Sequence, residues 1–259
     1  MLSALFVLLQ AATPAAAQPL PTLAELQFTE CLDLARKDAP SAVTDASLWA
    51  QQDGGYLARA CHGFALATDF KFNLAVPVLV EAAQGAEAKD DPRAARFWAQ
   101  AGNAAIADNQ PSEALTALGR ALAIAATNTE KADIEVDRAR ALVTLGQPEQ
   151  AVTALTSARQ LSPENGTAWL LSATLARRLN KLLDALTYIQ TSAALLPRDP
   201  AVALEAGNIA IAAGDETAAR KQWEQTIAIA PTSRQANSAQ AQLAALTPAP
   251  TTPADSQSR

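Results

Sequence analysis

The sequence predicts an all-α protein, an α-solenoid of antiparallel helix pairs, and three observations lead to that fold class. Alanine, the best helix former, is common throughout the 259 residues, whereas the alternation typical of strands is scarce. The 10 glycines and 15 prolines fall where helices would start and stop, and a hydrophobic fraction of 49% is ample for a buried core. A pattern of small and bulky side chains also recurs about every 34 residues.

Five small residues anchor this repeat, and the intervals between them become regular towards the end of the chain. The anchors are Ala75, Ala114, Ala151, Ala185 and Ala219. Four residues after each anchor stands a bulky apolar residue, in turn Leu79, Leu118, Leu155, Ile189 and Trp223. Twelve residues before each anchor stands a small residue, in turn Gly63, Gly102, Ala139, Ala173 and Gly207. Since residues four apart share one helical face, each unit is expected to be two helices packed through a small-against-bulky seam.

Turn signals separate the two helices of each unit. The residues at these turns are mostly of types that tolerate the left-handed conformation that ends a helix, and in chain order they are Phe70, Asn109, Gly146, Asn180 and Gly214. Prolines that cannot continue a helix close the last three units, at Pro163, Pro197 and Pro231.

These residues make the segment from Tyr56 to Ser233 resemble the tetratricopeptide repeat family, whose unit is two antiparallel helices with a small-residue seam and a closing proline. Trp98 and Trp169 match the large residue that the family favours early in its first helix. Pro77, within the first turns of a second helix, departs from the pattern. The resemblance implies a right-handed α-solenoid whose first helices line a concave, partner-binding face.

The helix breakers give a map of the chain. Helices are expected at 22–37, 40–52, 56–68, 73–85, 92–107, 111–125, 130–145, 148–160, 166–179, 182–195, 200–213, 216–229 and 232–246. Residues 18–55 are interpreted as an N-terminal helical cap or degenerate repeat, 56–231 as about five repeats and 232–246 as a capping helix. Residues 247–259 are too poor in apolar side chains to order themselves and are expected to be a disordered tail.

Residues 1–17 have the layout of a cleaved secretory signal peptide. An apolar run at residues 1–12, too short to span a bilayer, is followed by small residues up to Ala17. No Lys or Arg precedes the run, so an uncleaved N-terminal anchor is the alternative. We expect export, to the periplasm if the source is Gram-negative, and no membrane span in the mature chain. Alanine richness with Arg favoured over Lys is typical of a GC-rich bacterial genome.

Export bears on the two cysteines, because an oxidising compartment allows Cys31 and Cys61 to pair. Each lies on an apolar stripe at helical spacing, so both are expected to face inward. We predict a disulfide that joins the N-terminal segment to the first repeat. Two buried free thiols are the alternative.

Composition argues against several activities. A net charge of −6 and an aromatic fraction of 5% argue against a nucleic-acid surface. One histidine, two cysteines and no clustered ligands leave little material for a metal site or a nucleophile. We therefore expect no catalytic residues, no metal, no cofactor and no nucleic-acid partner.

The candidate partner-binding residues are those that face outward from the first helices under the family resemblance: Arg96, Asn103, Arg140, Leu170, Arg177, Arg178, Leu204 and Asn208. The arginines suit a carboxylate and the asparagines an extended peptide backbone. The alternative is that the arginines lie on solvated faces and pair with Asp133, Asp137 or Asp184.

We conclude from the sequence that the protein is an exported, non-enzymatic repeat scaffold that binds a protein or peptide in an envelope-associated assembly. Two alternatives remain open at this point. One is a structural subunit that associates with copies of itself, and the other is an accessory regulator of an envelope enzyme.

Overall fold

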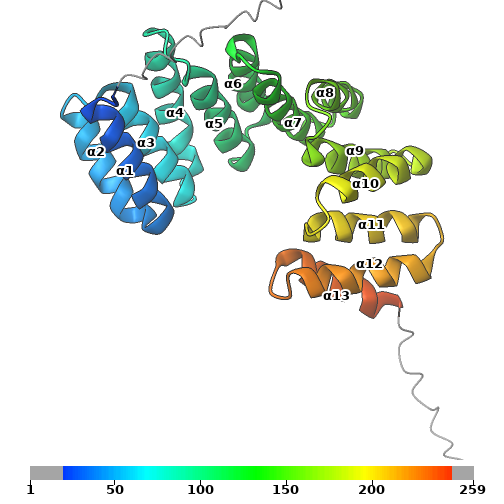
Figure 1. Ribbon diagram of the computed structural model, residues 1–259. Helices are drawn as coiled ribbons and strands as arrows, with labels where there is room; N and C mark the ends of the chain where they lie inside the picture. The colour runs from blue at the N-terminus through cyan, green and yellow to red at the C-terminus, as the bar shows by residue number, and fades with distance from the viewer. Residues whose placement is uncertain (1–19, 247–259) are drawn as a thin grey trace, which may run out of the picture.

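The computed structural model describes residues 20–246 (Figure 1). The predicted signal peptide, residues 1–17, and the predicted tail, residues 247–259, lie outside these residues. No helix among residues 20–246 combines the length and the apolar character that crossing a membrane requires.

Thirteen helices and no strand make up the described part of the chain. They are α1 (Leu23–Lys37), α2 (Ala39–Gln51), α3 (Gly55–Thr68), α4 (Phe72–Glu87), α5 (Ala94–Ala107), α6 (Pro111–Ile124), α7 (Asn128–Thr144), α8 (Pro148–Leu161), α9 (Gly166–Arg178), α10 (Leu182–Leu195), α11 (Pro200–Ala212), α12 (Glu216–Ile229) and α13 (Arg234–Leu246). Every predicted helix is present, with ends that differ by no more than two residues. The predicted all-α solenoid is confirmed.

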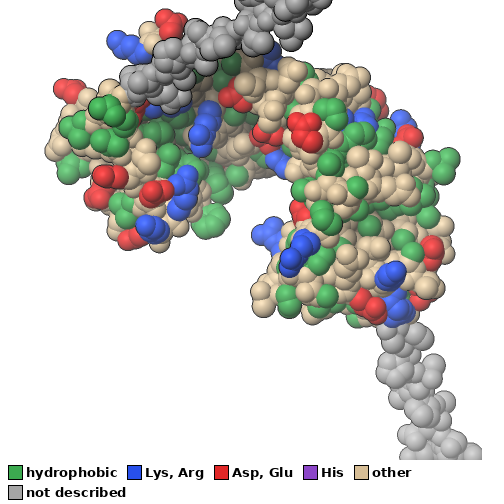
Figure 2. All heavy atoms as spheres, viewed as in Figure 1, with side chains coloured by type: hydrophobic (Ala, Val, Ile, Leu, Met, Phe, Trp, Pro, Cys, Tyr) green, Lys and Arg blue, Asp and Glu red, His purple; other side chains and the backbone are tan. Residues whose placement is uncertain are grey.

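The helices stack sideways in pairs, from α1 and α2 at the blue end to α13 at the red end (Figure 1). First helices also contact first helices of neighbouring pairs, as α5 does α7, α7 does α9 and α9 does α11. The stack is curved, and Figure 2 shows a hollow between the arm that holds α1–α7 and the arm that holds α9–α13.

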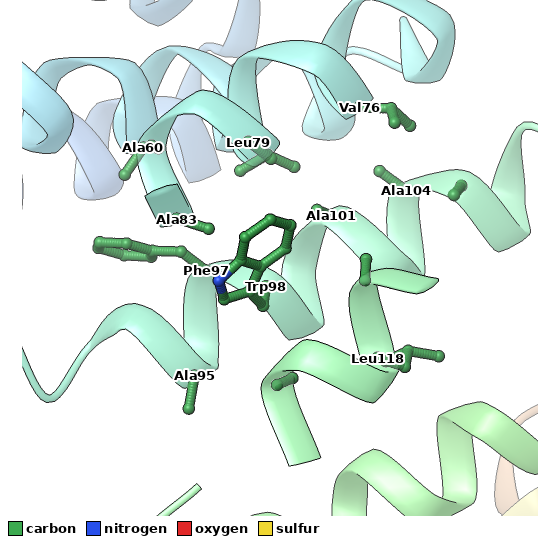
Figure 3. Close-up of a cluster of buried hydrophobic side chains, with 14 of the residues drawn as sticks. Ala60, Val76, Leu79, Ala83, Ala95, Phe97, Trp98, Ala101, Ala104 and Leu118 are labelled. Atoms are coloured by element: carbon green, nitrogen blue, oxygen red, sulfur yellow. The ribbon is translucent and has the colours of Figure 1, made fainter. Parts of the chain in front are cut away.

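The two helices of a pair pack against each other through the predicted seam, in which a small residue of one helix faces a bulky residue of the other. Leu118 of α6 is fully buried, and a Cβ added to Gly102 of α5 would lie 2.5 Å from its Cγ. Gly63 has the same relation to Leu79. Figure 3 shows this core, in which Trp98 of α5 lies beside the helix that carries Leu79. Small residues therefore let the helices approach until the bulky residue of the partner helix fills the gap.

The turn between the two helices of each repeat passes through the left-handed region. The residues that adopt a positive φ there are Phe70 (59°), Asn109 (57°), Gly146 (71°), Asn180 (58°) and Gly214 (84°). Phe70 is 81% exposed and contacts Phe72 edge-on. A bulky residue in this conformation is unfavourable, so the first repeat carries a cost at its turn that the other repeats avoid. Pro77, in contrast, is accommodated inside α4 without ending the helix.

The N-terminal helices are fixed to the first two repeats, by one contact to each. A disulfide joins Cys31 of α1 to Cys61 of α3, with Cα atoms 6.2 Å apart, as predicted. Arg93, before α5, donates to Glu25 of α1 at 3.3 Å and holds Asp91 through its Nε and Nη2. At the other end, α13 buries Ala236 and Ala239, packs Leu243 and Leu246 against the same core, and leaves its glutamines largely exposed.

Candidate functional site

Three pockets lie in a row between successive first helices, and we call this row the first-helix groove. The first pocket, of about 240 Å³, lies between α5 and α7. The middle pocket, of about 190 Å³, lies between α7 and α9 and reaches Leu155 of α8. The last pocket, of about 310 Å³, lies between α9, α11 and α13. Leu171 and Thr174 line both the middle and the last pocket, so these two pockets adjoin at α9.

The middle pocket combines an apolar floor with a basic rim. The floor is formed mainly by Val143, Leu155, Leu171 and Leu175. The rim carries Arg140 of α7 and Arg178 of α9. On α9 the residues that reach the pocket lie three or four apart, at Leu171, Thr174 and Arg178, because that spacing keeps side chains on one helical face.

Buried carboxylates lie beneath the groove on α7 and α11. Asp137 and Glu205 are only 9% and 6% exposed. Asn103 of α5 donates to Asp137 at 2.8 Å, and Arg140 donates to it at 2.5 Å. Burial raises the pKa of Asp137, while the hydrogen bonds from these two donors oppose that shift. The carboxylate thus joins two neighbouring first helices.

Glu205 makes the corresponding link between α9 and α11. Arg177 of α9 donates to it through Nε at 2.6 Å and Nη2 at 3.2 Å. Asn208 donates to it at 3.4 Å and accepts a hydrogen bond from Trp223 at 3.2 Å. A buried carboxylate is costly without hydrogen-bond partners, so Arg177 and Asn208 stabilise Glu205. The bond from Arg177 also links two neighbouring repeats.

The structure therefore divides the eight candidate residues into two groups. Five line the groove: Arg96 the first pocket, Arg140 and Arg178 the middle pocket, and Leu170 and Leu204 the last pocket. The other three, Asn103, Arg177 and Asn208, line none of these pockets and bind the buried carboxylates instead.

The alternative prediction was that the candidate arginines form ion pairs with acidic residues of the chain, and some of them do. Arg140 pairs with Asp137, as that alternative has it, whereas Arg177 pairs with Glu205, which was not foreseen. Asp133 accepts from Asn165 rather than from an arginine. Within residues 20–246, Arg178 forms no ion pair and no hydrogen bond through its side chain.

Two residues of the groove were not predicted from the sequence. Glu205 lies two repeat lengths after Asp137, and this periodicity is the signal that points to it. Arg234 of α13 lines the last pocket, although the polar pattern of α13 suggested only a cap. Among the described residues, no group of three or more His, Cys, Asp or Glu is placed to hold a metal ion.

Comparisons with known proteins agree with this fold. The sequence model of the tetratricopeptide repeat matches residues 136–200 and 170–234. No curated protein matches the sequence.

Solved structures share the architecture at low sequence identity. The apo form of the quorum sensor NprR from B. thuringiensis has a TM-score of 0.67 and 13% identity, over 86% of this chain and 69% of that one. PilF of Pseudomonas aeruginosa has a TM-score of 0.63 and 17% identity, over 85% and 99% of the two chains. BtubC (BKLC) from P. vanneervenii has a TM-score of 0.57 and 18% identity, over 89% and 96%. The family match, the repeat spacing and the helix pairing together identify tetratricopeptide repeats in residues 136–234, and the same all-α repeat architecture runs through the rest of the described residues.

Proposed function

We propose that the protein is a non-enzymatic scaffold that binds a protein or peptide partner along the first-helix groove. The row of three pockets carries this proposal, because it gives an extended segment successive places for its side chains. A repeat array buries its core between neighbours and therefore has surface available for a partner.

We also propose that the scaffold is exported and acts in an envelope-associated assembly, in the periplasm if the cell is Gram-negative. The layout of residues 1–17 supports export. The disulfide between Cys31 and Cys61 supports it independently, because disulfides persist in oxidising compartments and are rare in the cytosol.

Self-association is a second candidate, and one observation favours it. Leu23 and Leu26 of α1 and Leu48 of α2 are 73%, 48% and 55% exposed, so the N-terminal end of the array presents apolar side chains to solvent. Light scattering after size exclusion separates the two functions. A monomer at all concentrations supports partner binding, whereas a concentration-dependent oligomer supports self-assembly.

Partner capture from a solubilised envelope fraction tests the groove. Thr174→Arg introduces a long side chain where the middle and last pockets meet. Thr187→Arg is the matched control, because Thr187 is exposed on α10 and, like Thr174, donates its hydroxyl to the carbonyl four residues earlier. We expect the chain from residue 18 onwards to lose its partner with Thr174→Arg and to keep it with Thr187→Arg. Equal capture by both variants would refute the groove as the binding surface.

A further inference from the structure

We infer that the middle pocket of the first-helix groove takes an apolar side chain of the partner next to an Asp or Glu, so that the partner segment is acidic and apolar at this point. This inference rests on the proposed function and specifies what the groove selects. Cavity size, charge and the sequence register of the groove each support it.

The size of the pocket suits one apolar side chain. Its volume is about 190 Å³. A cavity of roughly 150 Å³ lined by aliphatic and aromatic side chains is large enough to bind benzene. The floor residues Val143, Leu155 and Leu171 offer no hydrogen-bonding side chain, so a leucine, methionine or phenylalanine satisfies the pocket better than a polar residue.

The rim charge is positive and only partly compensated. No acidic side chain lines the middle pocket. Arg178 is exposed and has no carboxylate partner within the described chain, and Arg140 pairs with Asp137 through a single nitrogen while 44% of its side chain stays exposed. A guanidinium presents a fork of donors that matches a carboxylate, so an acidic residue beside the apolar anchor is the complementary partner.

The first pocket shows that this preference is local. Arg96 lies there in a pocket that Glu130, Asp133 and Asp137 also line, so the lining of the first pocket carries more acidic than basic side chains. The register explains the difference, because Asp137, Leu171 and Glu205 occupy equivalent positions in three successive repeats. In the outer two repeats, Asp137 and Glu205 each accept from one donor on their own helix and from one on the preceding first helix, whereas the repeat between them has Leu171 at this position. Arg178 therefore remains available to an external acid, and Arg140, which gives one nitrogen to Asp137, keeps an exposed side chain beside it.

Fluorescence anisotropy with three labelled peptides tests this selectivity. All share one Gly/Ser host sequence, and their centres read Glu-Leu-Glu, Lys-Leu-Lys and Glu-Ala-Glu. The chain from residue 18 onwards is expected to bind the Glu-Leu-Glu peptide about tenfold more tightly than either of the others, because each loses the charge or the anchor. High salt is expected to weaken the Glu-Leu-Glu complex.

Charge reversal at the rim gives the decisive variants. Arg178→Glu is expected to weaken the Glu-Leu-Glu complex by about tenfold and to strengthen binding of the Lys-Leu-Lys peptide. Arg198→Glu is the matched control, since Arg198 is exposed between α10 and α11, lines none of the three pockets and changes the net charge equally. It is expected to leave both affinities within about twofold of the parent.

Each outcome decides the inference. Equal affinity for the three peptides, no measurable binding of any of them, or an unchanged preference in Arg178→Glu would overturn it. If that happens while Thr174→Arg still abolishes capture of the cellular partner, the groove function stands and only its acidic and apolar selectivity is wrong. If Thr174→Arg also leaves capture intact, both proposals fail.

Discussion

Replacing Gly102 by alanine tests whether the small-against-bulky seam holds the repeats together. The added Cβ would lie 2.5 Å from Cγ and 2.8 Å from Cδ2 of Leu118, and 3.3 Å from the carbonyl oxygen of Ala114. Leu118 is fully buried, and its Cγ is a branch point rather than the mobile end of a side chain. The clash can therefore be relieved only if α5 and α6 move apart or Leu118 leaves its rotamer.

The magnitude follows from two opposing effects. Overpacking a well-packed core costs about 1–3 kcal/mol, and alanine in place of glycine inside a helix contributes about 1 kcal/mol of stability. Because the contact involves a branch point, we expect the upper part of that cost and a net loss of about 1–2 kcal/mol in the free energy of unfolding. For a domain of this size, that loss lowers the melting temperature by roughly 2–8 °C.

Circular dichroism melting and urea unfolding measure the loss, with Gly119→Ala as the control. Gly119 lies inside α6, is exposed, and a Cβ there would meet no atom within 4 Å, so its replacement should raise stability by about 1 kcal/mol. In a Leu118→Ala background the clash disappears, and Gly102→Ala should become neutral or stabilising. If Gly102→Ala is as stabilising as Gly119→Ala in the otherwise unchanged protein, the seam argument is wrong.

Three further predictions concern the N-terminal half. Cys31→Ser should lower the free energy of unfolding by roughly 3.5 kcal/mol, the chain-entropy value for a loop closed between Cys31 and Cys61, and dithiothreitol should destabilise the parent but not the variant in urea unfolding. Phe70→Asn should raise stability by about 1 kcal/mol in thermal melts, because asparagine tolerates the positive φ; a loss of stability would show that the exposed ring contributes to the fold. Hydrogen bonds from Arg93 lower the pKa of Asp91 from 3.8 to about 2, so about 2 kcal/mol of stability present above pH 4 should be lost as the pH falls towards 2. Asp91→Asn should be less stable at neutral pH and lack this part of the acid sensitivity in urea titrations at each pH.

The fold could be predicted from the sequence because its determinants are local and periodic. Seam residues such as Gly102 and Leu118, and turn residues such as Asn109 and Gly146, recur at fixed offsets, and each repeat needs only its neighbours to bury its core. The disulfide was predictable for a different reason. Cys31 and Cys61 each lie on an inward-facing apolar face of a helix, and the two helices are close together in the chain and in the array.

The site was less predictable because helical periodicity fixes the direction of a side chain but not its partner. Asn103, Arg177 and Asn208 do come from the first helices, yet carboxylates within the array hold all three. Glu205 and Asp137 lie between neighbouring first helices, and a charge in that position has to be paired with donors of the fold itself.

The apolar floor of the middle pocket depends on one change in the repeat pattern, since Leu171 occupies the position that holds a carboxylate in the repeats on either side. With a carboxylate at position 171, the guanidinium group of Arg178 would have an acid of the fold itself nearby, as Arg177 has Glu205, and Arg140 would have a second one besides Asp137. Leu171 instead supplies apolar floor to the middle and last pockets and leaves that positive charge for an external group. In a repeat protein, the position where the pairing pattern is interrupted is therefore a better guide to a binding site than the number of exposed charges, because regular positions satisfy one another across the array.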